Sequence, residues 1–231
     1  MTPHIQRIDF SAQSPGIAKH YGDLYAILID NAFSAEECEA LIKLASDTGP
    51  WTPAGMSAQS VEQTVHKEFR YSERILRVDD DAANRIYDVL HPLLNDIHEI
   101  TPFGRWSCIT GKKEHKERPT WHLVGVNPRL SFLRYGPGHY FKPHCDGLLD
   151  LLDGKQKSFV TIHLYLNDDG VAGGATRFWT PDKKEYLDVE PKLGRVLVFQ
   201  QRMLVHSGEE VISGVKYTMR SELMFEQSES N

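Results

Sequence analysis

The sequence predicts an α+β fold, namely a jelly roll (double-stranded β-helix) preceded by supporting helices. Two segments before residue 100 have the periodicity of amphipathic helices, whereas from residue 130 onward short apolar segments are separated by glycine and aspartate. Many short strands at this spacing are typical of a sandwich or jelly roll whose polar inner face forms a pocket. No linker or repeat divides the 231 residues, so we expect a single domain with a helical or irregular support (1–129) and a core (130–226).

The predicted support begins with one strand and two helices. Leu24–Asp30 is a continuous apolar run typical of a buried strand. Ser34–Ser46 has helical periodicity, and its first residue and the glutamate three positions later form a capping box. The second helix is predicted to follow Asp80 or Asp81 as its cap, and Pro92 is expected to kink or end it.

Two further stretches of the support, Gly49–Phe69 and Phe103–Asn127, are polar and lack periodicity. Long irregular segments in a compact domain are usually lids or disordered connectors. Large apolar side chains are hard to explain in a freely solvated loop, so a lid or pocket wall is weighed equally with a connector. The side chains in question are Trp51, Met56, Phe103, Trp106 and Trp121.

The predicted core consists of short segments in which apolar and polar residues alternate or apolar residues run together. The six predicted strands are Leu130–Tyr135, Tyr140–His144, Ser158–Asn167, Ala175–Trp179, Arg195–Gln200 and Val215–Phe225.

Composition narrows the class of protein. A net charge of −6 and a pI near 6.0, with no stripe of Lys and Arg, argue against nucleic-acid binding. Three cysteines without a CxxC pattern indicate reduced thiols in a cytosolic protein. No signal-peptide pattern and no run of 18 apolar residues is present, so we expect a cytoplasmic protein without a membrane span. The oligomeric state is not indicated.

Two histidines and one aspartate have the pattern of an open metal site. His144 and Asp146 lie two positions apart at a predicted strand, where alternate side chains share one face, so both can reach a single metal. His206 is distant in sequence, but a rolled sheet can bring it beside them. Two imidazoles and one carboxylate fill half of an octahedral shell, which is the arrangement of a non-heme Fe(II) centre that also binds an oxidant and a cosubstrate.

Other interpretations of these histidines stay open. With eleven histidines in the chain, a His-x-Asp pair arises easily by chance, and His139 and His163 are the main competitors. His163 is expected on the inner face beside Thr161 and Tyr165. The same ligand set also suits a catalytic zinc in a hydrolase. A non-enzymic jelly-roll binding protein, with a structural metal or none, is the second alternative.

Three segments in the core carry a resemblance to a known family: LRYGPGHYFKPHCDG, SFVTIHLYLNDDGVAGGATRFW and VEPKLGRVLVFQQRMLVHSGEEVISGVKYTMRSELMF. In order and spacing they resemble the prolyl-4-hydroxylase-like branch of the 2-oxoglutarate/Fe(II)-dependent oxygenases. The resemblance implies a dioxygenase that uses Fe(II), 2-oxoglutarate and O2, with ascorbate as a reductant. It implies oxidation of an unactivated C–H bond, by default hydroxylation, with release of succinate and CO2; desaturation and ring closure would use the same site.

The resemblance also implies roles for individual residues. His144, Asp146 and His206 would bind Fe(II), and Lys216 would pair with the distal carboxylate of 2-oxoglutarate. The other cosubstrate contacts that it implies are Tyr165 on the same carboxylate, with Thr161 and Tyr135 lining the pocket. The Gly-Gly-Ala-Thr turn at Gly173–Thr176 is similar to a family turn that has an acidic residue in place of the alanine.

Arg220 is a second candidate for the cosubstrate carboxylate, because a guanidinium matches a carboxylate better than an ammonium does. Lys216 and Arg220 are four positions apart on one strand face, about 13 Å between Cα atoms. One is therefore expected to hold 2-oxoglutarate, with Lys216 slightly favoured, and the other to meet a polar or anionic group of the substrate. An ion pair with Glu222 is the alternative for either residue.

The substrate is left open between a small molecule, such as an amino acid or metabolite, and a prolyl residue of a peptide or protein. A small molecule is favoured because no peptide-binding companion domain is recognised. The substrate contacts predicted from the sequence are His163, Arg129 and Trp179, together with Arg220.

Overall fold

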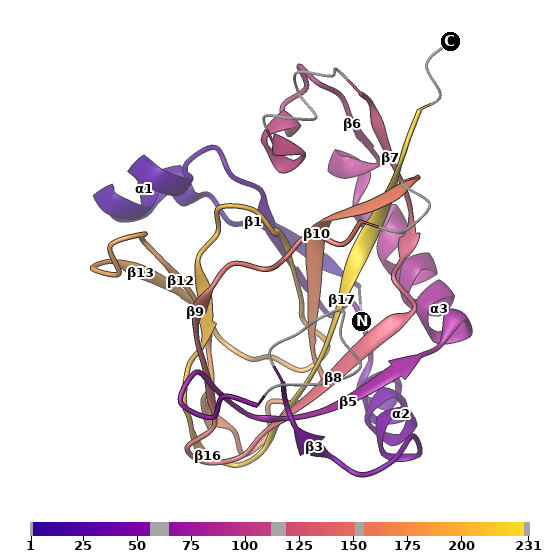
Figure 1. Ribbon diagram of the computed structural model, residues 1–231, viewed down its shortest axis with the longest axis vertical. Coiled ribbons are helices and arrows are strands. Elements are labelled where there is room, and N and C mark those ends of the chain that lie inside the picture. The colour runs from indigo at the N-terminus through magenta and orange to yellow at the C-terminus, as the bar shows by residue number, and fades with distance from the viewer. Residues whose placement is uncertain (1, 56–64, 112–118, 151–154, 229–231) are drawn as a thin grey trace.

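The computed structural model describes residues 2–55, 65–111, 119–150 and 155–228, which form a jelly roll of two sheets with two of its helices on the outer face of the main sheet (Figure 1). The paired strands are antiparallel. The α+β prediction is confirmed. The main sheet follows the order β1 (His4–Arg7), β2 (Ala26–Asp30), β14 (Val196–Gln200), β10 (Gln156–Tyr165), β17 (Lys216–Gln227), β8 (Arg129–Tyr135), β5 (Glu73–Val78) and β3 (Thr52–Pro53), with β7 (Trp121–Val126) also paired to β17 and β6 (Glu99–Ile100) to β7.

The second sheet faces the main sheet across the interior. Its order is β13 (Tyr186–Val189), β12 (Thr176–Trp179), β15 (His206–Gly208), β9 (Tyr140–His144) and β4 (Arg70–Tyr71). A separate two-stranded sheet pairs β11 (Ala172–Gly173), which comes just before β12 in the chain, with β16 (Val211–Ser213), which comes just after β15. All six strands predicted for the core are present, with ends that differ by at most a few residues.

Three α-helices are found in the described part of the chain: α1 (Pro15–Tyr21), α2 (Ala35–Ser46) and α3 (Asp80–Leu90). The capping box at the start of α2 is confirmed, since Ser34 accepts from the Glu37 amide and Glu37 accepts from the Ser34 amide. The cap predicted for α3 is wrong by one residue. Asp79 is the cap and accepts from the Ala82 amide, so both predicted caps lie inside the first turn, where acidic groups favour the helix dipole.

Helix α3 ends before Pro92, as predicted, and the chain continues in a 3-10 turn, His91–Leu93. Three further 3-10 turns are Asn95–Ile97, which precedes β6, Ser107–Ile109, which precedes β7, and Phe10–Ala12, which precedes α1.

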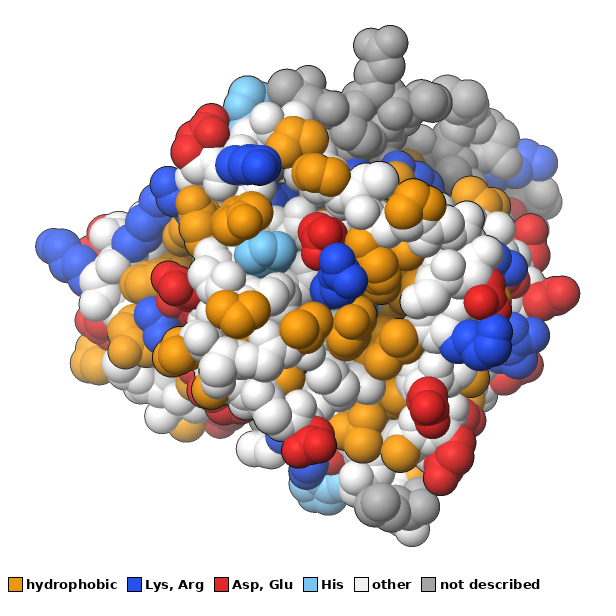
Figure 2. All heavy atoms as spheres, turned by 90° about the horizontal axis from the view of Figure 1, so that it is seen from below, with side chains coloured by type: hydrophobic (Ala, Val, Ile, Leu, Met, Phe, Trp, Pro, Cys, Tyr) orange, Lys and Arg blue, Asp and Glu red, His pale blue; other side chains and the backbone are white. Residues whose placement is uncertain are grey.

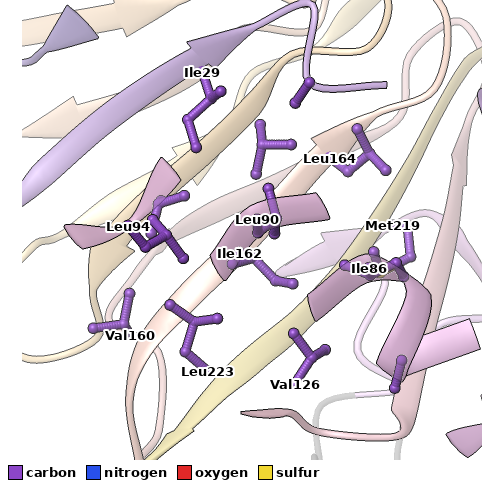
Figure 3. Packing of buried hydrophobic residues seen from close by; sticks show 14 of the residues in the cluster. Ile29, Ile86, Leu90, Leu94, Val126, Val160, Ile162, Leu164, Met219 and Leu223 are labelled. Atoms are coloured by element: carbon purple, nitrogen blue, oxygen red, sulfur yellow. The ribbon is translucent and has the colours of Figure 1, made fainter. Parts of the chain in front are cut away.

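The largest hydrophobic core lies between the outer face of the main sheet and helices α2 and α3, which are seen at the right of Figure 1. Ile86, Leu90 and Leu94 of the α3 region pack against Ile162 and Leu223 of the central strands (Figure 3). This apolar layer fixes the outer face of β10 and β17. Side chains alternate along a strand, so every second residue of β10 and β17 lies on the inner face. The apolar packing on the outer face holds these inner residues in position.

Leu90 tests this core, because it is fully buried in the layer. We expect Leu90→Ala to lower the free energy of unfolding by about 3 kcal/mol, from lost burial and the cavity left behind. The control is Val78→Ala, at a side chain that is 71% exposed and for which a change below about 0.5 kcal/mol is expected. Urea denaturation of the two variants measures the difference, and equal losses would contradict the assignment of the core.

The first 129 residues contribute more sheet than the prediction of a helical or irregular support included. Strands β5 and β7 join the main sheet beside β8 and β17. The stretch Phe103–Asn127 therefore contains a structural strand rather than only a lid or connector. Its alternation was obscured because β7 is short and its outward side chains are only partly exposed.

None of the predicted wall aromatics that the structure describes lines the interior cavity. Trp121 is buried against Phe159, Trp51 packs on Tyr217, and Trp106 contacts Tyr25. Phe103 is 71% exposed. Met56 lies outside the described residues. The three tryptophans thus support the scaffold, and the lid prediction gains no evidence from these side chains.

Strand register gathers polar residues on the inner face of the main sheet. Arg220 of β17 lies opposite His163 of β10 and Ser131 of β8. Lys216, at the start of β17, lies opposite Tyr135. All five side chains line a cavity of about 260 Å³ between the two sheets.

The surface carries charges of both signs. On the face in Figure 2, Lys and Arg side chains are interspersed with Asp and Glu and with apolar groups. The three cysteines, Cys38, Cys108 and Cys145, are unpaired, as predicted. Within the described residues, no helix has the length and apolar character needed to cross a membrane.

Candidate active site

His144, Asp146 and His206 meet at the wall of the interior cavity. His144 ends β9 and His206 begins β15, and the two residues are direct partners in the second sheet. Asp146 lies two residues beyond the end of β9. One ligand atom from each of the three side chains lies within 4.8 Å of the other two. Among the described residues, this is the one cluster of three or more His, Cys, Asp or Glu side chains that could hold a metal.

Both imidazoles are oriented by backbone carbonyls. His144 Nδ1 lies 2.8 Å from the Lys142 carbonyl oxygen, and His206 Nδ1 lies 3.1 Å from that of Leu204. A carbonyl only accepts, so Nδ1 carries the proton in both rings and Nε2 keeps its lone pair. Each Nε2 lies 3.8 Å from an oxygen of Asp146. Fixing the far nitrogen in this way is how proteins orient metal-binding histidines.

Asp146 is held by two partners of its own. The Thr161 hydroxyl donates to Oδ2 at 2.6 Å, and Arg220 Nη2 lies 3.2 Å from Oδ1. Burial alone would raise the pKa of Asp146, but the charges of Arg220 and the two histidines hold it well below its usual range. Burial and the nearby His206 lower the pKa of His144 to about 3. At neutral pH the site therefore offers a carboxylate and a neutral imidazole.

Lys216 supplies a buried ammonium deeper in the cavity. Its side chain is 2% exposed, lies 4.5 Å from the Tyr135 ring centre, and donates to the Gly174 carbonyl at 2.6 Å. Gly174 has φ +74°, and a Cβ at this position would lie 3.3 Å from the Lys216 side chain. The Gly-Gly turn is thus a close support for this lysine and not only a surface turn.

Comparison with known proteins agrees with this geometry. Residues 130–221 match the family model described as "2OG-Fe(II) oxygenase superfamily". The match spans the strands that carry the His-Asp-His cluster, Lys216 and Arg220. The core of this chain belongs to the 2OG-Fe(II) oxygenase superfamily. The chain is accordingly an oxidoreductase whose family uses Fe(II), 2-oxoglutarate and O2.

Solved structures share the fold of this oxygenase at low sequence identity. A Pseudomonas putida prolyl-4-hydroxylase is 18% identical, with a TM-score of 0.55 over 86% of this chain and 91% of that one. A Trichoplax adhaerens prolyl hydroxylase in complex with a hypoxia inducible factor peptide fragment is 17% identical, with a TM-score of 0.54 over 86% and 83%. A viral collagen prolyl hydroxylase of Paramecium Bursaria Chlorella virus-1 is 21% identical, with a TM-score of 0.51 over 87% and 96%. No curated protein matches the sequence significantly.

The residues present in the oxygenase fit the family's metal and cosubstrate. Two imidazole Nε2 atoms and one carboxylate converge on one point, and the other side of the cluster is the cavity, so the ligand shell is open as Fe(II) chemistry requires. The buried ammonium of Lys216 lies on the same cavity and suits the carboxylate of 2-oxoglutarate. The competitor histidines are not part of the cluster. His139 stacks on Tyr71, and His163 lies on the facing sheet.

The predicted cosubstrate contacts divide into two groups. Tyr135 and Thr161 line the cavity, although Thr161 also holds Asp146. Tyr165 is not on the cavity wall. Its hydroxyl donates to Thr176 at 2.6 Å, and Thr176 is the side chain that reaches the cavity. In this arrangement Thr176 lies between the Tyr165 hydroxyl and the cavity, and a direct contact of Tyr165 with 2-oxoglutarate stays a prediction.

Arg220 lies on the cavity and contacts a predicted metal ligand. Nη1 donates to Glu222 at 2.7 Å, so the ion pair considered as an alternative for Arg220 is present, with Glu222 buried and Arg220 half-buried. Burial opposes the charge of Arg220, but Asp146 and Glu222 raise its pKa above the ordinary value. This guanidinium is therefore tied to two carboxylates, whereas Lys216 donates to a neutral carbonyl.

Of the three predicted substrate contacts, His163 alone lines the cavity. Trp179 packs against Tyr186 and donates from Nε1 to Ser207, and it is not among the described residues that line the cavity. Arg129 begins β8 beyond the cavity lining. Neither side chain is among the described residues that line the cavity, because a sequence pattern does not determine on which side of a sheet, or how far along it, a side chain lies.

Several residues of the cavity wall were not predicted from the sequence, among them Arg70, Arg74, Phe141 and Phe199. Phe141 stacks on the His144 ring at 3.7 Å, and Phe199 packs edge-on against His206 at 4.8 Å. The alternation of Arg70, Ser72 and Arg74 was a signal that could have identified the two arginines, because it places polar residues on one side of an extended segment.

Proposed function

We propose that this oxygenase hydroxylates an unactivated C–H bond of a small molecule, such as an amino acid or metabolite, and releases succinate and CO2 from 2-oxoglutarate. The observation that carries this proposal is the open His-Asp-His cluster on a cavity of about 260 Å³. Pockets for small molecules are typically about 300–1,000 Å³. A cavity near the lower end of this range, which also has to admit 2-oxoglutarate, favours a small substrate.

In this proposal His144, Asp146 and His206 hold Fe(II), which supplies the oxidising chemistry when the metal, 2-oxoglutarate and O2 are bound. The Lys142 and Leu204 carbonyls keep both histidine Nε2 atoms unprotonated and directed at the metal. Thr161 and Arg220 hold the carboxylate of Asp146 in one orientation. These contacts preorganise the three ligands, so little side-chain entropy remains to be lost on metal binding.

Lys216 is proposed to bind the distal carboxylate of 2-oxoglutarate. Its ammonium would exchange the neutral Gly174 carbonyl for an anion, and a charge-assisted hydrogen bond in a buried site is stronger than a neutral one. Tyr135, beneath the ammonium, limits its position. Leu133, Phe141 and Phe199 provide apolar wall that excludes water from the bound reactants.

A prolyl residue of a peptide is the second candidate substrate. The observation that favours it is the fold, which this chain shares with the prolyl hydroxylases named above. A peptide would have to enter the cavity by one side chain while the rest of the peptide stays outside.

A zinc hydrolase is disfavoured by the cavity wall. Such an enzyme needs a general base beside the metal-bound water. Asp146 is the one carboxylate among the described residues that line the cavity, and it is already a ligand candidate.

Anaerobic addition of Fe(II) and 2-oxoglutarate tests the proposed chemistry. We expect the weak visible charge-transfer absorption of an iron–2-oxoglutarate chelate. Succinate release is then measured over free amino acids, small metabolites and prolyl peptides, with product mass as the readout. Tight zinc binding with no visible band would contradict the oxygenase proposal, and substrate-coupled release with prolyl peptides alone would replace the small molecule by a peptide.

The pH dependence of cosubstrate binding tests Lys216. In the free protein, burial lowers the pKa of Lys216 to about 8, while Glu190 and Glu209 act in the opposite direction. Binding to a carboxylate requires the ammonium, so the affinity is complete well below pH 8 and is lost as the pH rises through this value. We expect the Kd of 2-oxoglutarate to rise by about fivefold between pH 8 and 9. Lys216→Arg stays charged over this range, so any affinity that it retains should not vary; parallel pH profiles would contradict the assignment.

A further inference from the structure

We propose that Arg70 and Arg74 form an anion-binding wall of the cavity and that the substrate is a small molecule bearing a carboxylate or phosphate group. This inference rests on the proposed function, because it concerns the substrate half of the same site. The two arginines lie in a segment to which neither the predicted motifs nor the metal cluster assign a role.

The segment that carries the two arginines bridges the sheets. Arg70 lies on β4 of the second sheet, opposite Phe141 of the strand that bears His144. Four residues later, Arg74 lies on β5 of the main sheet, opposite Leu133. Both side chains line the cavity, and they are only 7% and 8% exposed. The cavity is thus bounded along this segment by two buried guanidinium groups.

Arg70 is a buried cation, and its hydrogen-bond partners among the described residues are neutral groups. Nε donates to the Ser72 hydroxyl at 3.2 Å, and Nη1 lies 3.5 Å from the Gly55 carbonyl oxygen. Its guanidinium carbon lies 4.4 Å from the Phe141 ring centre. Taking a charge out of water is costly unless it meets an opposite charge, so an anion in the cavity would complete this environment.

The environment of Arg74 also favours an anion. The pKa of Arg74 is lowered to about 10, mainly by burial and then by the charges of Arg70, Arg129 and Arg220. Burial is likewise the main cause that lowers the pKa of Arg70. A negative group between the two guanidiniums would relieve their mutual repulsion, and its oxygens match the planar donors of arginine.

The charge balance of the described cavity wall leads to the same result. Four cations line it, namely Arg70, Arg74, Lys216 and Arg220, against the single carboxylate of Asp146. Glu222 adds a second carboxylate behind Arg220. Fe(II) and the 2-oxoglutarate dianion balance each other in formal charge, so loading the site leaves the excess of cations over carboxylates among these described wall residues unchanged. An anionic substrate would complement this excess.

The arginines also lie between the active-site cavity and two neighbouring hollows. Arg70 lines a cavity of about 240 Å³ together with Lys67, Ser72 and His139. Arg74 lines one of about 310 Å³ together with Thr52 and Ile75. Each arginine therefore borders the active-site cavity and one neighbouring hollow.

Equilibrium dialysis against matched probes tests the inference without knowledge of the true substrate. The protein is loaded anaerobically with Fe(II) and saturating 2-oxoglutarate, and the visible chelate band confirms the loading. The probes are proline and prolinamide, hexanoate and hexanamide, phenylacetate and phenylacetamide, and phenyl phosphate. We expect at least one acid to bind, about tenfold or more tightly than its amide, because charge-assisted hydrogen bonds are lost in the amide.

Variants then locate the anion site. Arg70→Met and Arg74→Met are each expected to weaken acid binding by about tenfold, with little effect on the amide, while Arg70→Lys keeps part of the affinity. Arg85→Met, at an exposed arginine of α3, is the matched control and should bind like the unmodified protein. If a buried arginine variant does not fold, the acid–amide comparison on the unmodified protein still decides the charge preference.

Several results would overturn the inference: acids and amides binding alike, no acid binding at all, or Arg70→Met and Arg74→Met both folding and keeping full acid affinity. A glutamate-containing peptide that binds when no small acid does would overturn the small-molecule part. These failures are distinguishable from failure of the proposed function. If the proposed function is wrong, the chelate band itself is missing from the unmodified protein.

Discussion

Replacing Asp146 with alanine is expected to abolish the iron–2-oxoglutarate chelate and all turnover, while the protein remains folded. Asp146 is the one carboxylate among the described cavity residues and the group toward which both histidine Nε2 atoms point. Altered residues that merely support metal ligands already lower metal affinity by about 10–100-fold. Loss of a ligand should therefore exceed the upper end of that range.

Three measurements on the Asp146 variant separate metal loss from unfolding: Fe(II) content after dialysis, the visible chelate band, and thermal unfolding by circular dichroism. Asp146→Asn preserves the size of the side chain and an acceptor for Thr161 but removes the charge, so it should also lose the band with less effect on stability. Asp188→Ala is the control, since Asp188 is an ion-paired carboxylate on β13, away from the cavity. A variant at Asp146 that folds and keeps normal iron content would remove Asp146 from the ligand set.

The architecture of the core was predictable because it is encoded locally. The alternation along β10 and β17 reflects a sheet with an apolar outer face against α3 and a polar inner face on the cavity. The strands of the support were harder to identify. β5 and β7 are stabilised by pairing with β8 and β17, which are distant in sequence, and such pairing leaves little trace in the segment itself.

The metal cluster was predictable from two short motifs, but its surroundings were not. His144 and Asp146 are close in sequence, and the resemblance favoured His206 over the other histidines as their partner. Tyr165 and Trp179 lie in correctly predicted strands, yet one is separated from the cavity by Thr176 and the other packs against Tyr186. Strand register and the side chains in between decide such contacts, and both depend on tertiary packing.

The arginine wall was missed for the same physical reason. Arg70 and Arg74 belong to different sheets, and their convergence depends on the turn between β4 and β5. A sequence pattern indicates that alternate residues share one side, but it does not say which cavity that side meets. The long-range pairing of β4 with β9 provides that information.

Lys216→Met is expected to weaken 2-oxoglutarate binding by about 100-fold, whereas Arg220→Met is expected to weaken Fe(II) binding first. Losing one partner of a buried charge pair costs roughly 2–5 kcal/mol, and about 3 kcal/mol corresponds to a factor of ~100. Lys216 is buried, lies on the cavity and donates to a neutral carbonyl, so its charge is available to a cosubstrate. Arg220 already contacts Asp146 and Glu222, so its removal acts on the carboxylate that would bind the metal.

Separate titrations of Fe(II) and of 2-oxoglutarate distinguish the two residues. In Lys216→Met the metal affinity should stay within a few-fold of the unmodified protein, because no described contact joins Lys216 to the three ligands. In Arg220→Met the metal affinity should fall by about 10–100-fold, and the cosubstrate affinity should recover once the metal is saturating. The opposite pattern would assign the cosubstrate carboxylate to Arg220. The ammonium of Lys216 would then become a third cation available to the substrate, and the charge of the site would still favour an anion.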